Sequence, residues 1–394
     1  MNLPTGFRFA GVASGVKKSG KKDLALIVSD DPAVAAGVYT KNVVRAASID
    51  WNRQITPSDQ LRAIVVNSGN ANACTGDEGA ANNLQMATQT AELLGCQPEQ
   101  VCVMSTGVIG KQLPMDCIGK GIQQSAETLG ESLESYRLAS EAILTTDQGS
   151  KTASCEFEIG GETIRLAGMA KGAGMIGPNM ATMLGVVVTD AILEPSLAQE
   201  VLQRVADKSF NCISVEGHTS TNDALVMMAN GRSAVSLKQP EAIQLFTEKL
   251  TELCTQLAIQ IPADGEGATH LIDIRVSGAS SDADADTVAR SVAMSNLVKT
   301  AIAGADPNWG RITSAAGLTD VRFEPQDLCL SINGTSIFEN GQPITYDEAG
   351  LSKSMADNFE TQIELRLGSG AGQARHWTSD LNEQYVKFNS LYTT

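Results

Sequence analysis

The stretch Lys171-Gly-Ala-Gly-Met-Ile-Gly-Pro-Asn-Met-Ala-Thr-Met-Leu184 decides how this chain is interpreted. Apolar runs lie on both sides of it, at Ile164–Met169 and Leu184–Thr189. Short apolar runs bounded by turn residues are typical of buried strands, so we expect two strands joined through a glycine-rich loop. The loop ends on a threonine, Thr182, at the mouth of the second strand.

The first half of the stretch matches the G-x-G-x-x-G pattern of dinucleotide-binding folds, and Asp190 follows Gly172 by 18 residues. In those folds a helix opens at the glycines and holds the pyrophosphate at its N-terminus. Here Pro178 and a further apolar run follow instead. The sequence therefore disfavours a dinucleotide site.

Thr182 has two interpretations. A β-branched residue at the start of a strand can serve packing alone. If the peptide bond before it were cut, Thr182 would carry both a hydroxyl nucleophile and a free α-amine, whose reference pKa is about 7.7–8.0. That amine could act as general base for its own hydroxyl without any histidine. A chain with three scattered histidines, of which we expect His218 to be non-catalytic, fits this chemistry.

Two polar segments follow other apolar runs. In Met104-Ser-Thr-Gly-Val-Ile-Gly110, the Thr106 hydroxyl beside the Gly107 N–H offers two donors to a developing oxyanion. The alternative is an ordinary turn capped by a hydroxyl. Asn67-Ser-Gly-Asn-Ala-Asn-Ala73 is a second candidate turn, with more asparagine than solvation alone would require.

The overall composition narrows the class of protein. Hydrophobic residues make up 42% of the 394 residues and charged residues 19%, which is a folding, globular composition. The formal charge of -16 disfavours binding to nucleic acids or anionic membranes. No apolar run approaches the roughly 20 residues of a membrane span, and Met1–Val12 does not resemble a secretion signal. We expect a cytoplasmic protein.

The eight cysteines are spaced singly, with no C-x-x-C pair. This pattern indicates reduced, mostly buried thiols and no disulfide framework. No H-x-x-x-H spacing is present, so a zinc enzyme of that type is disfavoured and no metal site is expected.

Strand-like and helix-like segments mix without regular alternation, which favours an α+β fold in layers over a purely parallel sheet. Pro262–Ala268 and Gly278–Asp286 are polar loops around a strand at Leu271–Val276, and we expect a domain boundary within 265–280. Asn82–Leu94 carries apolar Leu84, Met86, Leu93 and Leu94 at helical spacing and ends at Gly95. The other expected strands are 24–28, 61–66 and 101–104, and the other expected helices are 197–205, 242–257 and 287–302.

The Lys171–Leu184 stretch closely resembles the self-cleavage segment of the ornithine acetyltransferase family, the ArgJ proteins of arginine biosynthesis. Further matching motifs run in family order to the end of the chain. They are Asn67–Gly76, Ser105–Gly110, Thr145–Asp147, Thr219–Asp223, Asp264–Thr269, Asp306–Ile312 and Tyr385–Thr394.

The resemblance implies self-cleavage between Ala181 and Thr182, with Thr182 then accepting acetyl from N-acetylornithine and passing it to glutamate. A covalent acetyl-threonine predicts ping-pong kinetics. Thr106 and Gly107 match the oxyanion pair of the family. The positions that match substrate-binding residues of the family are Thr145 or Thr146, Lys171, Thr182, Glu266, Asn389 and Thr394. Lys171 suits a substrate carboxylate. Glu266 suits the ornithine ammonium, or the amine of Thr182.

The family fold is a layered α/β sandwich, cleaved into two chains, with a smaller C-terminal α/β domain. Mapped onto this chain, 1–181 is the α chain, 182–270 starts the β chain, and 271–394 is the C-terminal domain. The resemblance implies an α2β2 heterotetramer without a bound cofactor, and the commoner family assignment adds acetyl-CoA as a second acetyl donor. The alternatives are a self-cleaving hydrolase similar to the β-aminopeptidases and a non-enzymatic amino-acid binding protein.

Overall fold

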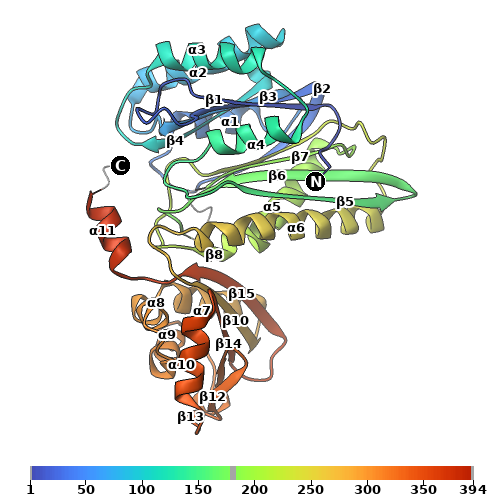
Figure 1. Ribbon diagram of the computed structural model, residues 1–394. Coiled ribbons are helices and arrows are strands. Elements are labelled where there is room, and N and C mark those ends of the chain that lie inside the picture. The colour runs from blue at the N-terminus through green and yellow to red at the C-terminus, as the bar shows by residue number, and fades with distance from the viewer. Residues whose placement is uncertain (1, 178–182, 392–394) are drawn as a thin grey trace. The chain divides into compact units, whose positions relative to one another are not determined.

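The computed structural model describes residues 2–177 and 183–391 of the chain. Ala181, Thr182 and Thr394, which carry the cleavage, nucleophile and terminal substrate-binding predictions, lie outside the described residues. The described chain divides into two compact units (Figure 1). The first unit holds residues 2–211 and 218–261, and the second holds 212–217 and 262–391.

The first unit is built on one continuous sheet with the strand order β4-β3-β2-β9-β7-β6-β5, in which β1 pairs with β2. Its strands are β1 (Phe7–Val12), β2 (Leu24–Tyr39), β3 (Ser58–Asn70), β4 (Val101–Val108), β5 (Lys151–Ile159), β6 (Glu162–Lys171), β7 (Leu184–Thr189) and β9 (Ala224–Ala229). The two strands expected around the glycine-rich loop are β6 and β7, which pair antiparallel. The described loop residues 172–177 contain no helix.

The long strand β2 joins two layers of this sheet. Its first half pairs with β1 and β3, and its second half pairs with β9, with register shifts between Val28 and Ala35. Figure 1 shows β1–β4 in one layer and β5–β7 in the other. Alternate residues of β3 face opposite sides. Ile64 and Val66 lie in the core between the layers, and Ala63 and Val65 lie in the core beneath α2 (Gly76–Leu94) and α3 (Met115–Glu127).

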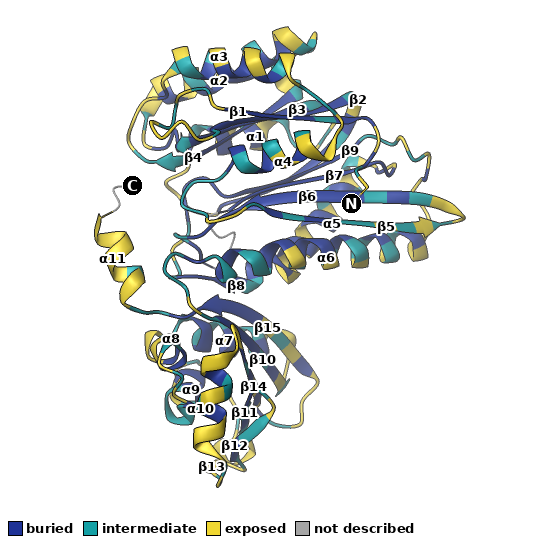
Figure 2. Ribbon diagram, in the orientation of Figure 1, coloured by how far each residue is buried: buried dark blue, intermediate teal, exposed yellow. Residues whose placement is uncertain are grey.

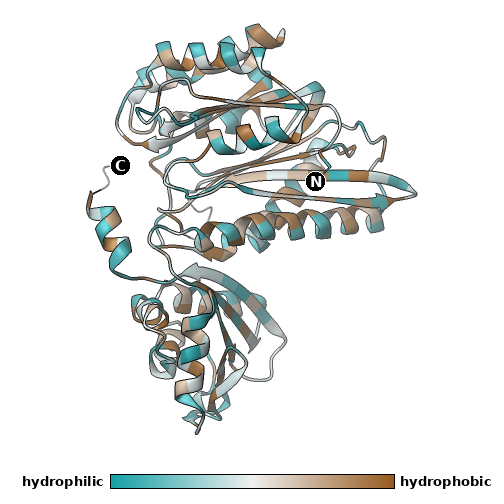
Figure 3. Cartoon of the chain, in the orientation of Figure 1, coloured by the Kyte–Doolittle hydropathy of each residue, from teal (hydrophilic) through white to brown (hydrophobic). Residues whose placement is uncertain are grey.

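Helices α2 and α3 cover the outer face of one layer, and α5 (Pro195–Lys208) and α6 (Pro240–Ala263) lie on the outer face of the other (Figure 1). Helices α1 (Ala47–Ile55) and α4 (Leu133–Ala142) instead contribute side chains to the core between the layers. Brown and teal alternate around α6 in Figure 3, because its apolar side packs on the sheet while its polar side faces outward. Gly168 on β6 makes this close approach possible, since a Cβ there would stand 2.8 Å from Leu257 of α6. The helices are α1 (Ala47–Ile55), α2 (Gly76–Leu94), α3 (Met115–Glu127), α4 (Leu133–Ala142), α5 (Pro195–Lys208) and α6 (Pro240–Ala263).

Helix α2 confirms the expected helix up to its end, where Gly95 adopts φ 65°. The expected apolar face is wrong in part, because Leu84 and Leu93 are 46% and 44% exposed. The buried face instead carries small and polar residues around Met86, namely Asn83, Ala87, Thr90 and Ala91. Such residues allow the helix to approach α3 and the sheet closely.

The second unit has a seven-stranded sheet with the order β13-β12-β11-β14-β10-β15-β8. Its strands are β8 (Ile213–Ser214), β10 (Leu271–Ala279), β11 (Cys329–Ile332), β12 (Thr335–Glu339), β13 (Gln342–Pro343), β14 (Glu360–Arg366) and β15 (Gly372–Ser379). Its helices are α7 (Asp282–Met294), α8 (Asn296–Ala303), α9 (Trp309–Ala316), α10 (Glu348–Asp357) and α11 (Glu383–Leu391). The dark-blue strands and yellow outer helix faces in Figure 2 show that its core lies between the sheet and α7–α10.

Two loop predictions in this region are wrong at their edges. Helix α6 continues through Pro262 to Ala263, so the loop starts later than expected. Helix α7 begins at Asp282 instead of residue 287, because the Ser281 side chain accepts a hydrogen bond from the Asp284 amide and caps the helix. The predicted single helix over 287–302 is interrupted at Ser295, which caps α8 in the same way.

None of the eight cysteines, all of which lie in the described part of the chain, forms a disulfide, and only Cys102 and Cys254 are buried. The prediction that most are buried is therefore wrong: Cys74 is exposed, and the others are half-buried. Among the described residues, no helix is long and apolar enough to cross a membrane, and no group of His, Cys, Asp and Glu is arranged to hold a metal ion.

Candidate active site

The predicted oxyanion pair lies at the end of β4. The β4 strand continues through Val108, so Thr106 and Gly107 are strand residues and the turn expected there is wrong. Thr106 is 5% exposed. Gly107 has φ 133°, and a Cβ on it would stand 2.3 Å from the carbonyl carbon of Gly69 on β3. Only glycine fits at this close approach of two backbones.

Buried asparagines hold the ends of β3 and β4 in place. The Ser105 hydroxyl donates to Asn67 Oδ1 at 2.6 Å, and Asn67 Nδ2 donates to the Asn70 carbonyl at 2.8 Å. Asn222 donates from Nδ2 to the carbonyl oxygens of Ser105 and Ala71, at 2.8 and 2.6 Å. The segment expected to be a polar turn at Asn67–Ala73 is thus a buried strand end and hydrogen-bond network. Because these groups are satisfied and buried, the network fixes the backbone next to Thr106.

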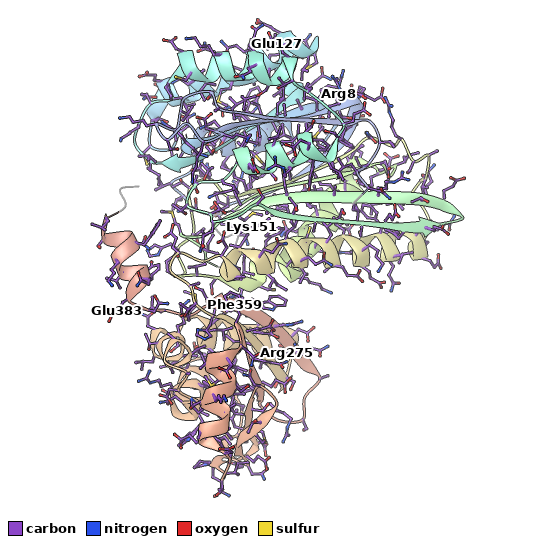
Figure 4. All side chains as sticks on the ribbon, in the orientation of Figure 1. Arg8, Glu127, Lys151, Arg275, Phe359 and Glu383 are labelled. Atoms are coloured by element: carbon purple, nitrogen blue, oxygen red, sulfur yellow. The ribbon has the colours of Figure 1, made fainter. Side chains whose placement is uncertain are left out.

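A charged cluster lies at the end of β6. Asp147 Oδ1 accepts hydrogen bonds from Lys151 Nζ at 2.8 Å and from the Gly172 amide at 2.6 Å. Its Oδ2 accepts from the Thr145 amide at 3.0 Å and lies 3.9 Å from Lys171 Nζ. The side chains of Asp147, Lys151 and Lys171 are 0%, 2% and 3% exposed. Lys151, labelled in Figure 4, enters the cluster from the first residue of β5.

The two ammonium groups decide the charge of Asp147. Burial opposes ionisation, but Lys171 and Lys151 hold the pKa of the Asp147 carboxyl well below its ordinary value. The carboxylate therefore stays charged at neutral pH. With two cations and one anion, the cluster has a net positive charge, which suits an anionic ligand.

A cavity of about 330 Å³ adjoins this cluster, and Thr145 and Asp147 are among its lining residues. Lys17 lines it too and donates from Nζ to the carbonyl oxygens of Lys22 and Leu144 at 2.8 and 2.6 Å. The pKa of Lys17 is lowered to about 8, mainly by burial, with Asp23 opposing the shift and Lys171 adding to it. Thr146, the other half of the threonine pair, is not among the residues that line this cavity.

Asp223 is the residue directly before β9, and sequence reasoning gave it no role. The Ala224 amide donates to the Met183 carbonyl at 3.1 Å, so Asp223 lies beside the residue that follows Thr182 in the chain. The carboxyl is fully buried, and neither oxygen makes a hydrogen bond of ordinary geometry with a described residue. Burial raises the pKa of Asp223 well above its ordinary value, although the nearby hydroxyls of Thr40 and Ser220 and the Met183 amide oppose this. The positive charge of Lys171 also opposes this rise in the pKa of Asp223.

Two further predicted residues meet in the second unit. Asn389 on α11 donates from Nδ2 to Glu266 Oε2 at 3.1 Å. The Glu266 loop is tied to the start of α11, since Asn382 Nδ2 donates to the Gly267 carbonyl at 2.8 Å. A Cβ on Gly267 would stand 2.4 Å from the Tyr385 amide nitrogen, so this packing also requires glycine.

The structure therefore groups the predicted residues within each unit. In the first unit, Asn222 connects the Thr106 strand end to the loop that leads to Asp223 and Met183, and the Lys171 cluster lies on the strand paired with β7. In the second unit, Glu266 and Asn389 are in contact. Sequence reasoning missed Asp147, Asp223 and Asn222. All three residues fall in motifs that match the family, Thr145–Asp147 and Thr219–Asp223, so the sequence did mark their positions. It did not indicate what chemistry they carry out.

Comparison with known proteins agrees with this fold. Residues 8–394 match the model of the ArgJ family. The arginine biosynthesis bifunctional protein ArgJ of Rhodopirellula baltica is 50% identical over 395 residues, covering 100% of this chain and 96% of that protein. Its namesake from a Synechococcus strain is 44% identical over 406 residues, covering 100% of this chain and 97% of that protein.

Among solved structures, a crystal structure of the arginine biosynthesis bifunctional protein ArgJ of Bacillus halodurans has a TM-score of 0.51 at 36% identity. It matches 52% of this chain and is itself 98% covered. The chain therefore belongs to the ArgJ family, and the layered α+β fold expected from the sequence is confirmed.

Proposed function

We propose that this protein is a self-cleaving acetyltransferase of arginine biosynthesis, which moves acetyl from N2-acetyl-L-ornithine to L-glutamate through an acetyl-Thr182 intermediate. The observation that carries the proposal is the buried end of β4, where Asn222 Nδ2 donates a hydrogen bond to the Ser105 carbonyl, next to Thr106 and Gly107. Asn222 lies in the loop before β9, the strand that pairs with β7. A hydroxyl and a backbone amide fixed in this way are the preorganised donors that acyl transfer needs.

The full-length likeness to relatives named for arginine biosynthesis supports the reaction class. The length of the solved Bacillus halodurans chain supports self-cleavage. Since 52% of 394 residues is about 205 and this is 98% of that chain, it has about half the length of the present one. Cleavage before Thr182 would give pieces of 181 and 394 - 181 = 213 residues.

The charge of the first unit's site fits the proposed substrates. Glutamate and acetylornithine both carry carboxylates, and the Lys171 cluster has a net positive charge in a largely buried setting. Lys171 would bind the substrate carboxylate, while Asp147 keeps both buried ammonium groups compatible with folding. Thr145, whose amide Asp147 already orients, is the member of the threonine pair that we assign to substrate.

In the second unit, the Glu266 carboxylate would receive the ornithine ammonium, and Asn389 holds one of its oxygens in place. Thr394 is also part of this proposal, as a substrate-binding residue. The same proposal includes cleavage into the chains 1–181 and 182–394 and their assembly as an α2β2 heterotetramer. It also includes the absence of a bound cofactor, the use of acetyl-CoA as second donor and a cytoplasmic location. The name of the relatives, which calls them bifunctional, supports the use of a second donor.

Steady-state kinetics test the transfer. Acetylornithine and glutamate should give parallel lines in double-reciprocal plots, because one product leaves before the second substrate binds. Mass spectrometry should find an extra acetyl group on the fragment beginning at Thr182 when acetylornithine is supplied alone. Release of acetate to water without transfer to glutamate would instead indicate a hydrolase.

A further inference from the structure

The loop between β1 and β2 holds the densest group of lysines in an acidic chain. Lys17, Lys18, Lys21 and Lys22 lie within six residues, although the formal charge of the whole chain is -16. Lys18 and Lys21 are exposed, and Lys17 and Lys22 are half-buried. Positive charges at this density repel one another, so the loop suits an anionic ligand. The proposed transfer from acetylornithine to glutamate assigns the loop no role.

A buried carboxylate fixes the first part of this loop. Asp23 is 0% exposed, and its Oδ1 accepts hydrogen bonds from the amide and the hydroxyl of Ser14 at 2.6 and 2.8 Å. Its Oδ2 accepts from the amides of Gly15 and Lys17 at 3.2 and 2.8 Å. Gly15 has φ 98°, a conformation that favours glycine. The loop is therefore preorganised, and little conformational freedom is lost when a ligand binds to it.

Lys17 connects the loop to the charged cluster at the end of β6. Its Nζ donates to the carbonyl oxygens of Lys22, within the loop, and of Leu144, which lines the cavity beside the cluster. Its pKa is lowered to about 8, mainly by burial, with the positive charges of Lys171 and Lys21 adding to the shift. The electrostatic fields of the cluster and of the loop thus overlap at Lys17.

Two cavities share Lys21 and Lys22 in their walls. One is the cavity of about 330 Å³ that adjoins the Lys171 cluster, and the other has a volume of about 440 Å³. The second cavity has apolar and polar walls, which include Ala10, Val12 and Leu138 on the apolar side and Gln124, Thr128 and Ser135 on the polar side. Two hollows that share a cationic boundary fit a ligand whose anionic groups lie between two uncharged parts.

We propose that the loop Lys17–Lys22 is the phosphate-binding part of an acetyl-CoA site. Lys21 and Lys22 bind the phosphates, the nucleoside occupies the cavity of about 440 Å³, and the acetylated pantetheine arm lies in the cavity of about 330 Å³ beside Thr145. Lys17 positions the loop. The inference rests on the proposed function, in which acetyl-CoA is the second acetyl donor, and it adds the place where this donor binds.

The chemistry of coenzyme A matches this arrangement. Its phosphate groups surround the ribose, between a flat adenine and a long, uncharged pantetheine arm. Lysine ammonium groups bind phosphate as compact point charges. Adenine combines apolar faces with hydrogen-bonding edges, and the second cavity offers apolar Ala10 and Leu138 together with the side-chain amide of Gln124. The pantetheine arm directs the acetyl group toward the Lys171 cluster, which binds the acceptor carboxylate in the proposed function.

Lys21 is the position at which this site is tested. The Lys22 ammonium group already donates to Glu141 Oε2 at 3.0 Å, so a phosphate competes with that carboxylate for Lys22. Lys21 is exposed, and Lys21→Gln removes its charge without disturbing a packed core. Lys238→Gln is the matched control, because Lys238 is also an exposed lysine of the first unit and lines neither cavity.

The first measurement compares two acetyl donors in the acetylation of glutamate. Acetyl-CoA carries the phosphates, whereas S-acetylpantetheine has the same thioester and arm without nucleotide or phosphate. Lys21→Gln should lower kcat/KM for acetyl-CoA about 10-fold, through loss of a charge-assisted contact, and change kcat/KM for S-acetylpantetheine less than about twofold. Lys238→Gln should leave kcat/KM for both donors within about twofold of the wild type.

Equal losses with the two donors would show that Lys21 does not act on the phosphates and would overturn the site. An unchanged kcat/KM for acetyl-CoA in Lys21→Gln would overturn it too. So would an equal loss in Lys238→Gln, because the effect would then reflect the net charge of the protein alone.

The second measurement is the binding of coenzyme A by isothermal titration calorimetry, which needs no catalysis. The wild type should bind coenzyme A, and Lys21→Gln should bind it about 10-fold more weakly. A wild type that transfers acetyl from acetylornithine but neither binds coenzyme A nor uses acetyl-CoA would overturn the site and leave that transfer standing. A wild type that binds coenzyme A through Lys21 but transfers no acetyl would contradict the proposed function and support the site, so the two failures are distinguishable.

Discussion

Replacing Asp147 by asparagine removes a buried carboxylate that lies next to Lys151 and Lys171. The change is isosteric, but it removes a negative charge that lies 2.8 Å from Lys151 Nζ and 3.9 Å from Lys171 Nζ in the native protein. Breaking a buried ion pair by removing one partner costs about 3–5 kcal/mol. No discount for solvent screening applies, because all three side chains are at most 3% exposed.

The assay is thermal unfolding in a Thr182→Ala background, so that wild-type and variant proteins remain single chains. At about 2–4 °C per kcal/mol for a unit of this size, Asp147→Asn should lower Tm by about 6–20 °C at pH 7. Asp50→Asn is the control: its pair with Arg45 is exposed, and its loss should cost no more than about 1 kcal/mol.

The pH dependence gives a second check on the same variant. The pKa of Asp147 is depressed in the folded state, so its stabilising effect is complete above the unfolded pKa of about 3.9 and is lost as pH falls below it. The Tm difference from the wild type should therefore be constant near neutrality and shrink in acid. A Tm for Asp147→Asn within the error of the Asp50→Asn control at pH 7 would refute the assignment.

Three other changes test separate parts of the site. Gly107→Ala should prevent or strongly slow self-cleavage and lower Tm, because the new Cβ would stand 2.3 Å from the Gly69 carbonyl carbon and the φ of 133° disfavours alanine. Normal cleavage and an unchanged Tm would contradict the close contact between the ends of β3 and β4. Lys171→Met should raise KM for glutamate about 10–100-fold through loss of a charge-assisted hydrogen bond, and an unchanged KM would remove Lys171 from the site. Asn222→Ala should lower Tm by leaving two buried carbonyl groups without donors, and an unchanged Tm would show that water replaces the amide.

The strands and helices were largely predictable because their apolar residues recur at strand or helix spacing. Leu184–Thr189 became β7 with the expected bounds, and Asn82–Leu94 lies within α2. The errors arose where polar residues form regular structure. Asp282 and Asp284 look like loop residues but occupy the first turn of α7, where acidic side chains are favoured. Asn67 and Asn70 look like turn formers but are buried strand residues.

The functional site was predictable only where a residue's chemistry is visible locally. Thr106 and Gly107 stood out because a hydroxyl and a glycine amide are adjacent in sequence. Asp147 and Asp223 did not, because what makes them unusual is burial and the partners brought by distant strands. A sequence shows an aspartate, but only the fold shows that two lysines lower the pKa of Asp147 and that burial raises the pKa of Asp223.

The central claim is that Thr182 becomes an N-terminal nucleophile by self-cleavage, and denaturing mass spectrometry tests it most directly. The purified protein should give two fragments of 181 and 213 residues, the larger beginning at Thr182, and Thr182→Ala should give one intact chain. A single intact chain in both samples would mean that the free amine never forms, and it would contradict the proposed mechanism.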